Sequence, residues 1–432
     1  MERKIVKDLD KWKRSDYRKP LIIYGARQVG KTYLALTFGK VQYKNTAYFN
    51  MEDSSELAAI FERDLNPERI VAELAVMSGQ TIFQEDTLII FDEIQACERA
   101  LTSLKYFCEQ APGYHIIAAG SLLGVAVNRE KYSFPVGKVD MLQLYPLDFE
   151  EFLWATGNTD LGSLIRIAAK ENKPLSLHES AMDLYRRYLV VGGMPEAVLQ
   201  FVKTGDYNFV LATQKSLNDA YIADMAKYAT PHETARIMAA WASVPGQLAK
   251  ENRKFQYAGI KSGARAYEYE MPINWLKAAG VINQCVKVSA GQIPLSAYAD
   301  SNFFKLYMMD TGLLCSKFDL PATAVISSTP SYGGFKGALA ENYVMQALVA
   351  ANYTPYYWES AGKAEVDFVL QNRNGSVIPI ETKAAENVRS KSLNLFMEKY
   401  NPPYALRISG KNFGFENKIR SIPLYVVYCL DS

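Results

Sequence analysis

The stretch Leu21-Ile-Ile-Tyr-Gly-Ala-Arg-Gln-Val-Gly-Lys-Thr32 decides the fold of the first third of the chain. Its first four residues are apolar, which predicts a strand buried in a parallel sheet. The next eight residues match the pattern Gly-x-x-x-x-Gly-Lys-Thr, a turn between a strand and a helix that holds phosphate groups. Glycines let the backbone approach phosphate oxygens closely, and the helix N-terminus adds positive potential. The stretch therefore predicts a phosphate-binding loop.

Each residue of this loop has an expected task. Lys31 would reach the β- and γ-phosphates of a nucleotide, and the hydroxyl of Thr32 would ligate Mg²⁺. The alternative is a glycine-rich turn with a chance lysine, but the strand before the loop and the helix-compatible residues after it provide the context that the motif requires. The expected binding residues are Gly25, Ala26, Arg27, Gln28, Val29, Gly30, Lys31, Thr32 and Tyr33.

The composition is that of an ordinary globular protein. The chain has 432 residues, a formal net charge of +2 and five scattered cysteines without metal-ligand spacing. The length predicts about three domains. The small net charge does not indicate nucleic-acid binding, although it leaves open a local basic face. Scattered cysteines are typical of reduced thiols. Because no basic-then-apolar leader and no membrane-spanning stretch is present, we expect a cytoplasmic protein without membrane contact.

A second acidic motif follows about 60 residues after the loop. The sequence Leu88-Ile-Ile-Phe-Asp92-Glu93 is an apolar strand that ends in two acids, the Walker B pattern. Asp92 would hold Mg²⁺, and Glu93 would polarise the attacking water as a general base. Many buried strands end in an acid, but this one follows a phosphate loop at the expected distance.

The strand predicted at 114–119 ends in Gly120-Ser121. In P-loop ATPases with an acid pair, a further strand lies between the loop strand and the Walker B strand. A polar residue at its end touches the γ-phosphate or the water. Ser121 has that place in the sequence, although a serine that merely starts a loop after a strand is an equally good interpretation.

At this point the chain resembles the prokaryotic AAA-type ATPases whose C-terminal region is known only as a domain of unknown function. The resemblance covers nearly the whole chain and implies an AAA-like sheet, ATP and Mg²⁺. It rests on the two motifs above, on Gly120-Ser121, on Leu144–Leu153, on Gly192–Glu196, on Phe304–Leu314 and on C-terminal segments. Relatives often carry Gly-Arg where this chain has Gly137-Lys138. Lysine keeps the charge of an arginine finger but lacks its planar fork, so the resemblance leaves the finger role of Lys138 open.

The middle of the chain is predominantly helical in pattern. Residues 146–240 predict a helical lid, in which Gly192-Gly193 ends one helix and Pro195 starts the next. Residues 241–330 resemble a winged helix, with helices over 243–252 and 266–279 and wing strands over 280–288 and 303–309. This segment would bind DNA phosphates through Lys254, Lys261 and Arg265, or it would be a structural connector. Glu268 and Glu270 favour the connector.

The last hundred residues carry an acidic constellation. Asp367 in Ala-Glu-Val-Asp-Phe, then Glu381-Thr-Lys383, lie on two predicted strands, and Glu341 lies on the preceding helix. The pattern resembles the PD-(D/E)XK nucleases, which implies that Asp367 and Glu381 share a divalent ion, with help from Glu341, while Lys383 stabilises the reacting phosphate. A fold kept as a docking module, with Lys383 in a salt bridge, is the alternative, because fold does not imply function.

Together these patterns predict an α/β protein. The expected segments are a P-loop ATPase core at 1–145, a helical lid at 146–240, a winged-helix segment at 241–330 and an α/β restriction-endonuclease-like domain at 331–432. We expect an ATPase that uses Mg²⁺ to drive or switch a partner interaction through its C-terminal part, the partner being protein, DNA or RNA. The rivals are an ATP-regulated, metal-dependent nuclease of DNA or RNA and an ATP-binding switch, or DNA-binding protein, that hardly hydrolyses ATP.

Overall fold

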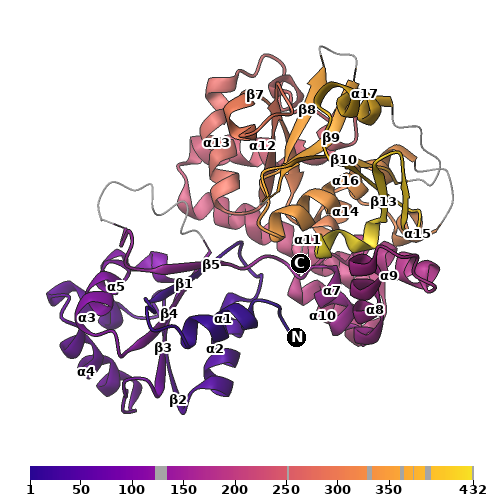
Figure 1. Ribbon diagram of the computed structural model, residues 1–432. Coiled ribbons are helices and arrows are strands. Elements are labelled where there is room, and N and C mark those ends of the chain that lie inside the picture. Colours follow the sequence, from indigo (N-terminus) through magenta and orange to yellow (C-terminus); the bar gives the residue numbers. More distant parts are fainter. Residues whose placement is uncertain are drawn as a thin grey trace. The chain divides into compact units, whose positions relative to one another are not determined.

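A computed structural model describes residues 1–121, 134–250, 253–327, 333–360, 364–372, 374–384 and 391–430. The chain divides into two compact units. The N-terminal unit comprises residues 3–145 and 278–280, and the C-terminal unit comprises residues 1–2, 146–277 and 281–432. Each unit has a sheet of its own (Figure 1).

In the described part of the N-terminal unit, five parallel strands form a sheet in the order β2-β3-β4-β1-β5. The first strand is the apolar run that opens the phosphate-loop motif, and β4 pairs with both β1 and β3, as the sequence predicts. The strands are β1 (Leu21–Tyr24), β2 (Asn45–Asn50), β3 (Thr87–Asp92), β4 (His115–Gly120) and β5 (Asp140–Gln143).

Helices cover both faces of this sheet. One face packs against the apolar sides of α3, α4 and α5, and together they form a continuous core. The other face meets α2, which follows β1 directly. The helices are α1 (Val6–Lys13), α2 (Lys31–Gln42), α3 (Ser55–Arg63), α4 (Pro67–Ser78), η1 (Ile94–Ala96) and α5 (Glu98–Gln110). Because both faces are covered, β1, β3 and β4 are buried along almost their whole length, which explains their continuous apolar sequences.

The C-terminal unit begins with helices. A capping box at Asp148 starts the first of them, and Pro195 occupies the first turn of α10, as its sequence predicts. The helices are α7 (Phe149–Ala155), α8 (Thr159–Glu171), α9 (His178–Val191), α10 (Pro195–Thr204), α11 (Tyr207–Tyr228), α12 (Pro231–Leu248), η2 (Tyr257–Gly259) and α13 (Ala266–Ala278). Residues 243–248 are the end of α12, so the separate short helix expected over 243–252 is wrong.

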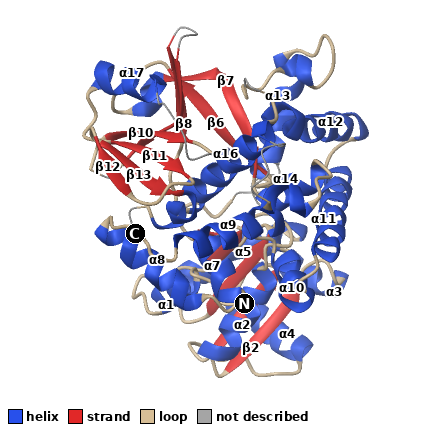
Figure 2. Ribbon diagram, turned by 90° about the vertical axis from the view of Figure 1, so that its right-hand side faces the viewer, coloured by secondary structure: helices blue, strands red, loops and turns tan. Residues whose placement is uncertain are grey.

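A mixed sheet follows, in which the described residues form eight strands in the order β12-β13-β11-β10-β9-β8-β6-β7. Helix α17 packs on one face of the sheet, and α16 lies against the other (Figure 2). The strands are β6 (Ile282–Val288), β7 (Ala299–Met308), β8 (Tyr356–Ser360), β9 (Ala364–Gln371), β10 (Val377–Thr382), β11 (Ala405–Ser409), β12 (Gly414–Glu416) and β13 (Ile419–Pro423). Between and after them lie η3 (Leu295–Tyr298), α14 (Thr311–Lys317), α15 (Ala322–Ile326), α16 (Gly333–Ala350), α17 (Lys391–Tyr400) and η5 (Leu424–Cys429).

The expected wing strands belong to this sheet. β6 and β7 form an antiparallel pair, as a wing would, but β6 also pairs in parallel with β8 across Val286 and Tyr356. Strands on both sides of residue 331 therefore share one sheet, and the winged-helix segment and the fourfold division of the chain remain predictions. Among the described helices, none is both long and apolar enough to cross a bilayer.

Candidate functional site

The loop after β1 has the backbone shape that its glycines permit. Gly25 has φ +146° and Gly30 has φ +95°, while Gln28 also has a positive φ of 64°. A Cβ on Gly25 would lie 2.2 Å from the carbonyl oxygen of Leu144, which follows the neighbouring strand β5. Only glycine fits there, because that carbonyl is fixed backbone. The loop then leads into α2, whose first residue is Lys31.

The ammonium group of Lys31 is turned into the loop. Its Nζ donates hydrogen bonds to the carbonyl oxygens of Gly25 at 3.0 Å and Ala26 at 2.8 Å. The side chain is buried, so the loop encloses a positive charge beside the N-terminus of a helix. Among the remaining expected loop residues, Ala26 and Val29 are buried, Arg27 is half-buried and Tyr33 is exposed.

Thr32 and Asp92 meet at the carboxyl end of the sheet. The Thr32 hydroxyl donates to Oδ2 of Asp92 at 2.7 Å, although the two residues are 60 positions apart. The hydroxyl of Tyr48 donates to the same oxygen at 2.9 Å. The sequence predicts both Thr32 and Asp92 as magnesium ligands, but it does not predict this direct hydrogen bond. Tyr48 was missed, because nothing distinguishes it from other tyrosines in strands until the pairing of β2 with β3 is known.

Glu93 stands just beyond β3 in a left-handed backbone conformation, with φ 48°. Its backbone N–H donates to Oδ1 of Asp92 at 3.0 Å, and its carboxylate accepts a hydrogen bond from the side-chain amide of Gln95. A positive φ is uncommon for a residue with a side chain and is found at functional sites more often than elsewhere. The two acids are therefore held in distinct places, Asp92 against Thr32 and Glu93 against Gln95.

Ser121 follows the last residue of β4 and is buried. Because β4 lies between β1 and β3 and all three are parallel, Ser121 is at the same sheet edge as the phosphate loop and Asp92. The structure thus gathers Lys31, Thr32, Asp92, Glu93 and Ser121 at one edge.

Lys138 lies at the opposite edge. It precedes β5, which runs parallel to β1 with Asp140 beside Leu21, so it is at the amino end of the sheet. Its ammonium forms an ion pair with Glu109 of α5 at 2.9 Å, and that hydrogen bond raises the pKa of Lys138. Lys138 is therefore not part of the loop edge of its own sheet.

No sequence motif points to Arg3. Its guanidinium is buried and donates to the carbonyl oxygen of Val29, inside the phosphate loop, at 3.1 Å. It also donates to the carbonyl oxygen of Tyr145 at 2.6 Å. Tyr145 is the residue at which the N-terminal unit ends, so one side chain joins the loop to the point where the chain leaves this unit.

In the C-terminal unit, the two strand acids of the nuclease-like pattern lie on neighbouring strands. β9 and β10 are antiparallel with Phe368 opposite Ile380, which puts Asp367 beside Glu381. Oδ2 of Asp367 accepts the Thr382 N–H at 2.8 Å, and Lys383 forms an ion pair with Oε1 of Glu381 at 3.0 Å. Oε2 of Glu381 is buried and has no hydrogen-bond partner among the described residues. Burial and the Glu341 carboxylate raise the pKa of Asp367 from 3.8 to about 7.

Glu341 is engaged elsewhere. Its Oε1 accepts hydrogen bonds from Lys305 at 3.0 Å and from the Tyr307 hydroxyl at 2.6 Å, and its Oε2 is paired with Arg253. Lys305 is fully buried and also contacts Glu365 at 2.6 Å. Burial alone would raise the pKa of Glu341, but these two cations outweigh it and lower the pKa. We call Arg253, Lys305, Glu341 and Glu365 the ion-pair core.

The sequence predicted none of the cations in this core. They come from the segment before β8. Lys305 lies in the apolar second half of β7, residues 303–308. Within the described ranges, no group of three or more His, Cys, Asp or Glu side chains is arranged to hold a metal ion. Of the expected DNA-phosphate contacts, Lys254 is paired with Glu359, while Lys261 and Arg265 are exposed.

The N-terminal unit is thus a parallel α/β sheet with a phosphate-loop motif after its first strand. Residues 17–153 match the AAA domain family, and residues 182–324 and 336–427 match two families that are each described as a domain of unknown function. The last match agrees with the resemblance inferred from the sequence. An uncharacterized protein of Methanocaldococcus jannaschii is 23% identical over 206 residues, 44% of this chain. The chain spans about two fifths of that relative's length, since the match covers 41% of it.

Solved structures of similar chains include a Walker-type ATPase of Pyrococcus abyssi, with 14% identity and a TM-score of 0.44 over 73% of this chain and 95% of that one. The ORC2 protein of Aeropyrum pernix has 14% identity and a TM-score of 0.35, over 78% and 94% of the two chains. The RuvB Holliday junction branch migration motor of Thermotoga maritima has 14% identity and a TM-score of 0.31, over 68% and 88%. Scores below 0.5 do not establish a common architecture for the whole chain.

Proposed function

We propose that the N-terminal unit binds ATP together with Mg²⁺ and hydrolyses it. The observation that carries this proposal is the 2.7 Å contact between the Thr32 hydroxyl and Asp92, beside a loop that encloses the Lys31 ammonium. A nucleoside triphosphate is positioned for in-line attack by water through a strand, a glycine turn, a lysine, a hydroxyl and an acid at the end of a strand.

The residues fit a magnesium ion. Oxygen ligands are what Mg²⁺ prefers, and Thr32 and Asp92 bring a hydroxyl and a carboxylate together at the loop edge. When bound, the ion would neutralise charge that develops on the β- and γ-phosphate oxygens. The Tyr48 hydroxyl, bonded to the same Asp92 oxygen, would orient that carboxylate.

The protein's own groups would then act as follows. The loop N–H groups and Lys31 bind the phosphates, after Lys31 exchanges its carbonyl partners for phosphate oxygens. Glu93 takes the proton of the attacking water, which requires it to leave Gln95. Ser121 donates from its hydroxyl to the γ-phosphate or the water, since it is at the same edge.

The substitution Glu93→Gln tests the hydrolysis. We expect the turnover of ATP to fall by at least about 100-fold, because an amide cannot accept the proton, while ATP binding persists. The rate of phosphate release and the affinity for a fluorescent ATP analogue are measured together. Glu98→Gln, on α5 of the same unit, is the matched control and retains wild-type turnover. An unchanged rate in Glu93→Gln with intact binding would leave the non-hydrolysing switch as the function.

Turnover would change how the C-terminal unit engages a partner. Arg3 supports this part of the proposal, because it bonds both the phosphate loop and Tyr145, where the chain leaves the N-terminal unit. The partner would be a protein or a nucleic acid, with Lys261 and Arg265 as exposed cations for phosphates.

All five cysteines are described and none forms a disulfide, which supports a cytoplasmic location.

Metal-dependent nuclease activity is the second candidate. It is favoured by Asp367 and Glu381 on adjacent strands, with Lys383 beside them and one Glu381 oxygen without a partner among the described residues. It is disfavoured by the ion-pair core, in which two protein cations already compensate the Glu341 carboxylate. Incubation of the wild type and of Asp367→Ala with labelled DNA and RNA and Mg²⁺ tests whether this site cuts nucleic acid. Cutting that Asp367→Ala loses would establish the nuclease, and cutting that survives would exclude this site.

A further inference from the structure

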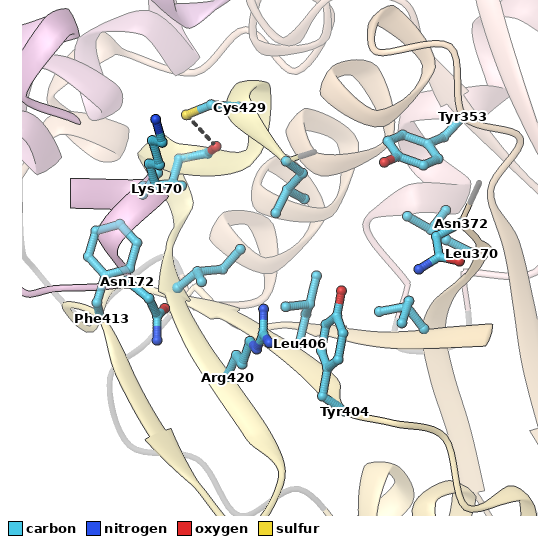
Figure 3. Close-up of a pocket in the computed structure, with 15 residues that line it drawn as sticks. Lys170, Asn172, Tyr353, Leu370, Asn372, Tyr404, Leu406, Phe413, Arg420 and Cys429 are labelled. Carbon is cyan, nitrogen blue, oxygen red and sulfur yellow. Dashed lines mark hydrogen bonds between the residues drawn. The ribbon is translucent and has the colours of Figure 1, made fainter. Parts of the chain in front are cut away.

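A cavity of about 170 Å³ opens in the C-terminal unit, and no residue of the ion-pair core lines it. It lies between the end of α8, the segment around η5, and strands β9, β10, β11 and β13 of the mixed sheet (Figure 3). The floor of the cavity is aliphatic, because alternate residues of the paired strands point to this face. The residues that form the floor are Leu370, Ile378, Leu406, Ile422, Val426 and Leu430.

The rim of the cavity is polar and positively charged. Arg420 of β13 is opposite Leu406 of β11 in the sheet, so its guanidinium stands over the aliphatic floor. It stacks on the ring of Tyr404, with 4.1 Å between the guanidinium carbon and the ring centroid. Figure 3 shows the polar tips of Arg420, Tyr404 and Asn372 directed toward the cavity.

The charged residues that line this cavity are of one sign. Lys170 and Arg420 line it, and none of the described lining residues is aspartate or glutamate. Arg420 is exposed at the rim, and it has no ion pair among the described residues. A guanidinium that is fixed by an aromatic ring and lacks a carboxylate is suited to bind a carboxylate from outside the chain, through two parallel hydrogen bonds.

The volume limits the size of the occupant. A cavity of about 150 Å³ lined by apolar side chains is large enough for benzene. The present cavity therefore has room for one ring and a short polar group. Tyr404 and Phe413 provide aromatic walls for such a ring, and Asn372 provides an amide beside it.

We propose that this cavity is a binding site for a small monocyclic aromatic carboxylate. The ring lies on the aliphatic floor, and the carboxylate accepts hydrogen bonds from Arg420. This inference is independent of ATP binding by the N-terminal unit, since every lining residue belongs to the C-terminal unit.

Phenylacetate is the probe, and its neutral analogue phenylacetamide is the matched ligand. Binding to the full chain is measured by isothermal titration calorimetry and by ligand-observed NMR. We expect phenylacetate to bind at least about tenfold more tightly than phenylacetamide, because only the carboxylate can pair with the guanidinium. Binding is expected to be unaffected by ATP.

Two variants and a control locate the site. Arg420→Gln should weaken phenylacetate binding about tenfold and should reduce the preference over phenylacetamide. Ala169→Phe, on the half-buried rim at α8, should block the cavity and abolish the binding of both ligands. Lys411→Gln removes an exposed cation outside the lining and should bind as the wild type does. Thermal melting checks that each variant is folded.

The proposal would be overturned if the wild type bound no phenylacetate at about 10 mM, which is ten times a dissociation constant of about 1 mM. Equal binding of the two ligands would also overturn it, as would wild-type affinity in folded Arg420→Gln. Failure of ATP binding with retained phenylacetate binding would refute the proposed function of the N-terminal unit alone.

Discussion

Arg3 contacts the phosphate loop but belongs to no sequence motif. Its guanidinium bridges the carbonyl oxygens of Val29 and Tyr145 from a buried position. A loop that must hold its N–H groups toward phosphate has to keep its carbonyls turned away, and a fixed donor on one of those carbonyls does this.

Replacement of Arg3 should therefore weaken nucleotide binding through the shape of the loop, although Arg3 itself would not touch the nucleotide. We expect Arg3→Met to raise the dissociation constant for ATP about tenfold, since two charge-assisted hydrogen bonds are lost from the loop and its exit. Equilibrium titration with a fluorescent ATP analogue measures this. Arg14→Met, which removes an exposed arginine at the end of α1, should leave the affinity unchanged. Equal affinities for all three proteins would mean that Arg3 does not shape the loop.

Asp367 should make stability depend on pH. Its pKa is raised from 3.8 to about 7, chiefly by burial, so the folded protein keeps this proton where the unfolded chain loses it. Stability from this group is complete below pH 3.8 and is lost as pH rises through about 7. In Asp367→Asn, the free energy of unfolding should fall less between pH 4 and 7 than in the wild type.

Urea unfolding across this pH range provides the measurement. Asp319→Asn is the control, because Asp319 is exposed and should leave the pH profile unchanged. If the free energy of unfolding changed over this pH range by the same amount in the wild type and in both variants, the raised pKa of Asp367 would be contradicted.

At the scale of elements, β7 gives the ion-pair core its buried cation. Lys305 is fully buried and contacts Glu341 of α16 and Glu365 of β9, so it joins two strands and a helix. Removal of one member of a buried ion pair leaves a charge without compensation, which costs more than the loss of an exposed pair.

Lys305→Met should lower the free energy of unfolding by about 3–5 kcal/mol, because the buried Glu341 carboxylate and the half-buried Glu365 carboxylate lose their shared cation. Lys215→Met, which breaks the exposed pair with Asp319, should cost less than about 1 kcal/mol. Both values come from urea unfolding with and without Mg²⁺. Stability of Lys305→Met that Mg²⁺ restores would show that these carboxylates form a metal site after all.

The elements of the N-terminal sheet were predictable because their signals are local. β1, β3 and β4 are continuous apolar runs, each followed directly by the residues that mark its function, such as Gly25 after β1 and Asp92 at the end of β3. Tyr48 and Arg3 were not predictable, because neither lies in a motif that marks it as a partner of Asp92 or of the phosphate loop.

The C-terminal sheet shows where local patterns stop. The pairing of β6 with β8 joins Val286 to Tyr356, and the predicted wing gives no sign of it. The acids Asp367 and Glu381 were correctly expected on adjacent strands, because a short turn connects β9 and β10. Lys305 was missed, since a lysine in the apolar half of a strand indicates nothing until its partners are known.

At the scale of the whole molecule, the chain joins a region that matches the AAA domain family to a larger unit that matches two domain families of unknown function. The two units have separate sheets, and the sites proposed here are each confined to one of them. Nucleotide chemistry would belong to the N-terminal unit, and the C-terminal unit would provide the contacts that turnover controls.

Titration of the full chain with ATP in the presence of Mg²⁺ tests the central claim most directly. Calorimetry should show one ATP bound per chain, and Lys31→Ala should weaken this binding at least about 100-fold, because the ammonium enclosed by the loop is lost. Lys40→Ala, an exposed lysine on the same helix, should bind as the wild type does. A folded wild-type protein that binds no ATP with Mg²⁺ present, or Lys31→Ala with undiminished affinity, would contradict the account.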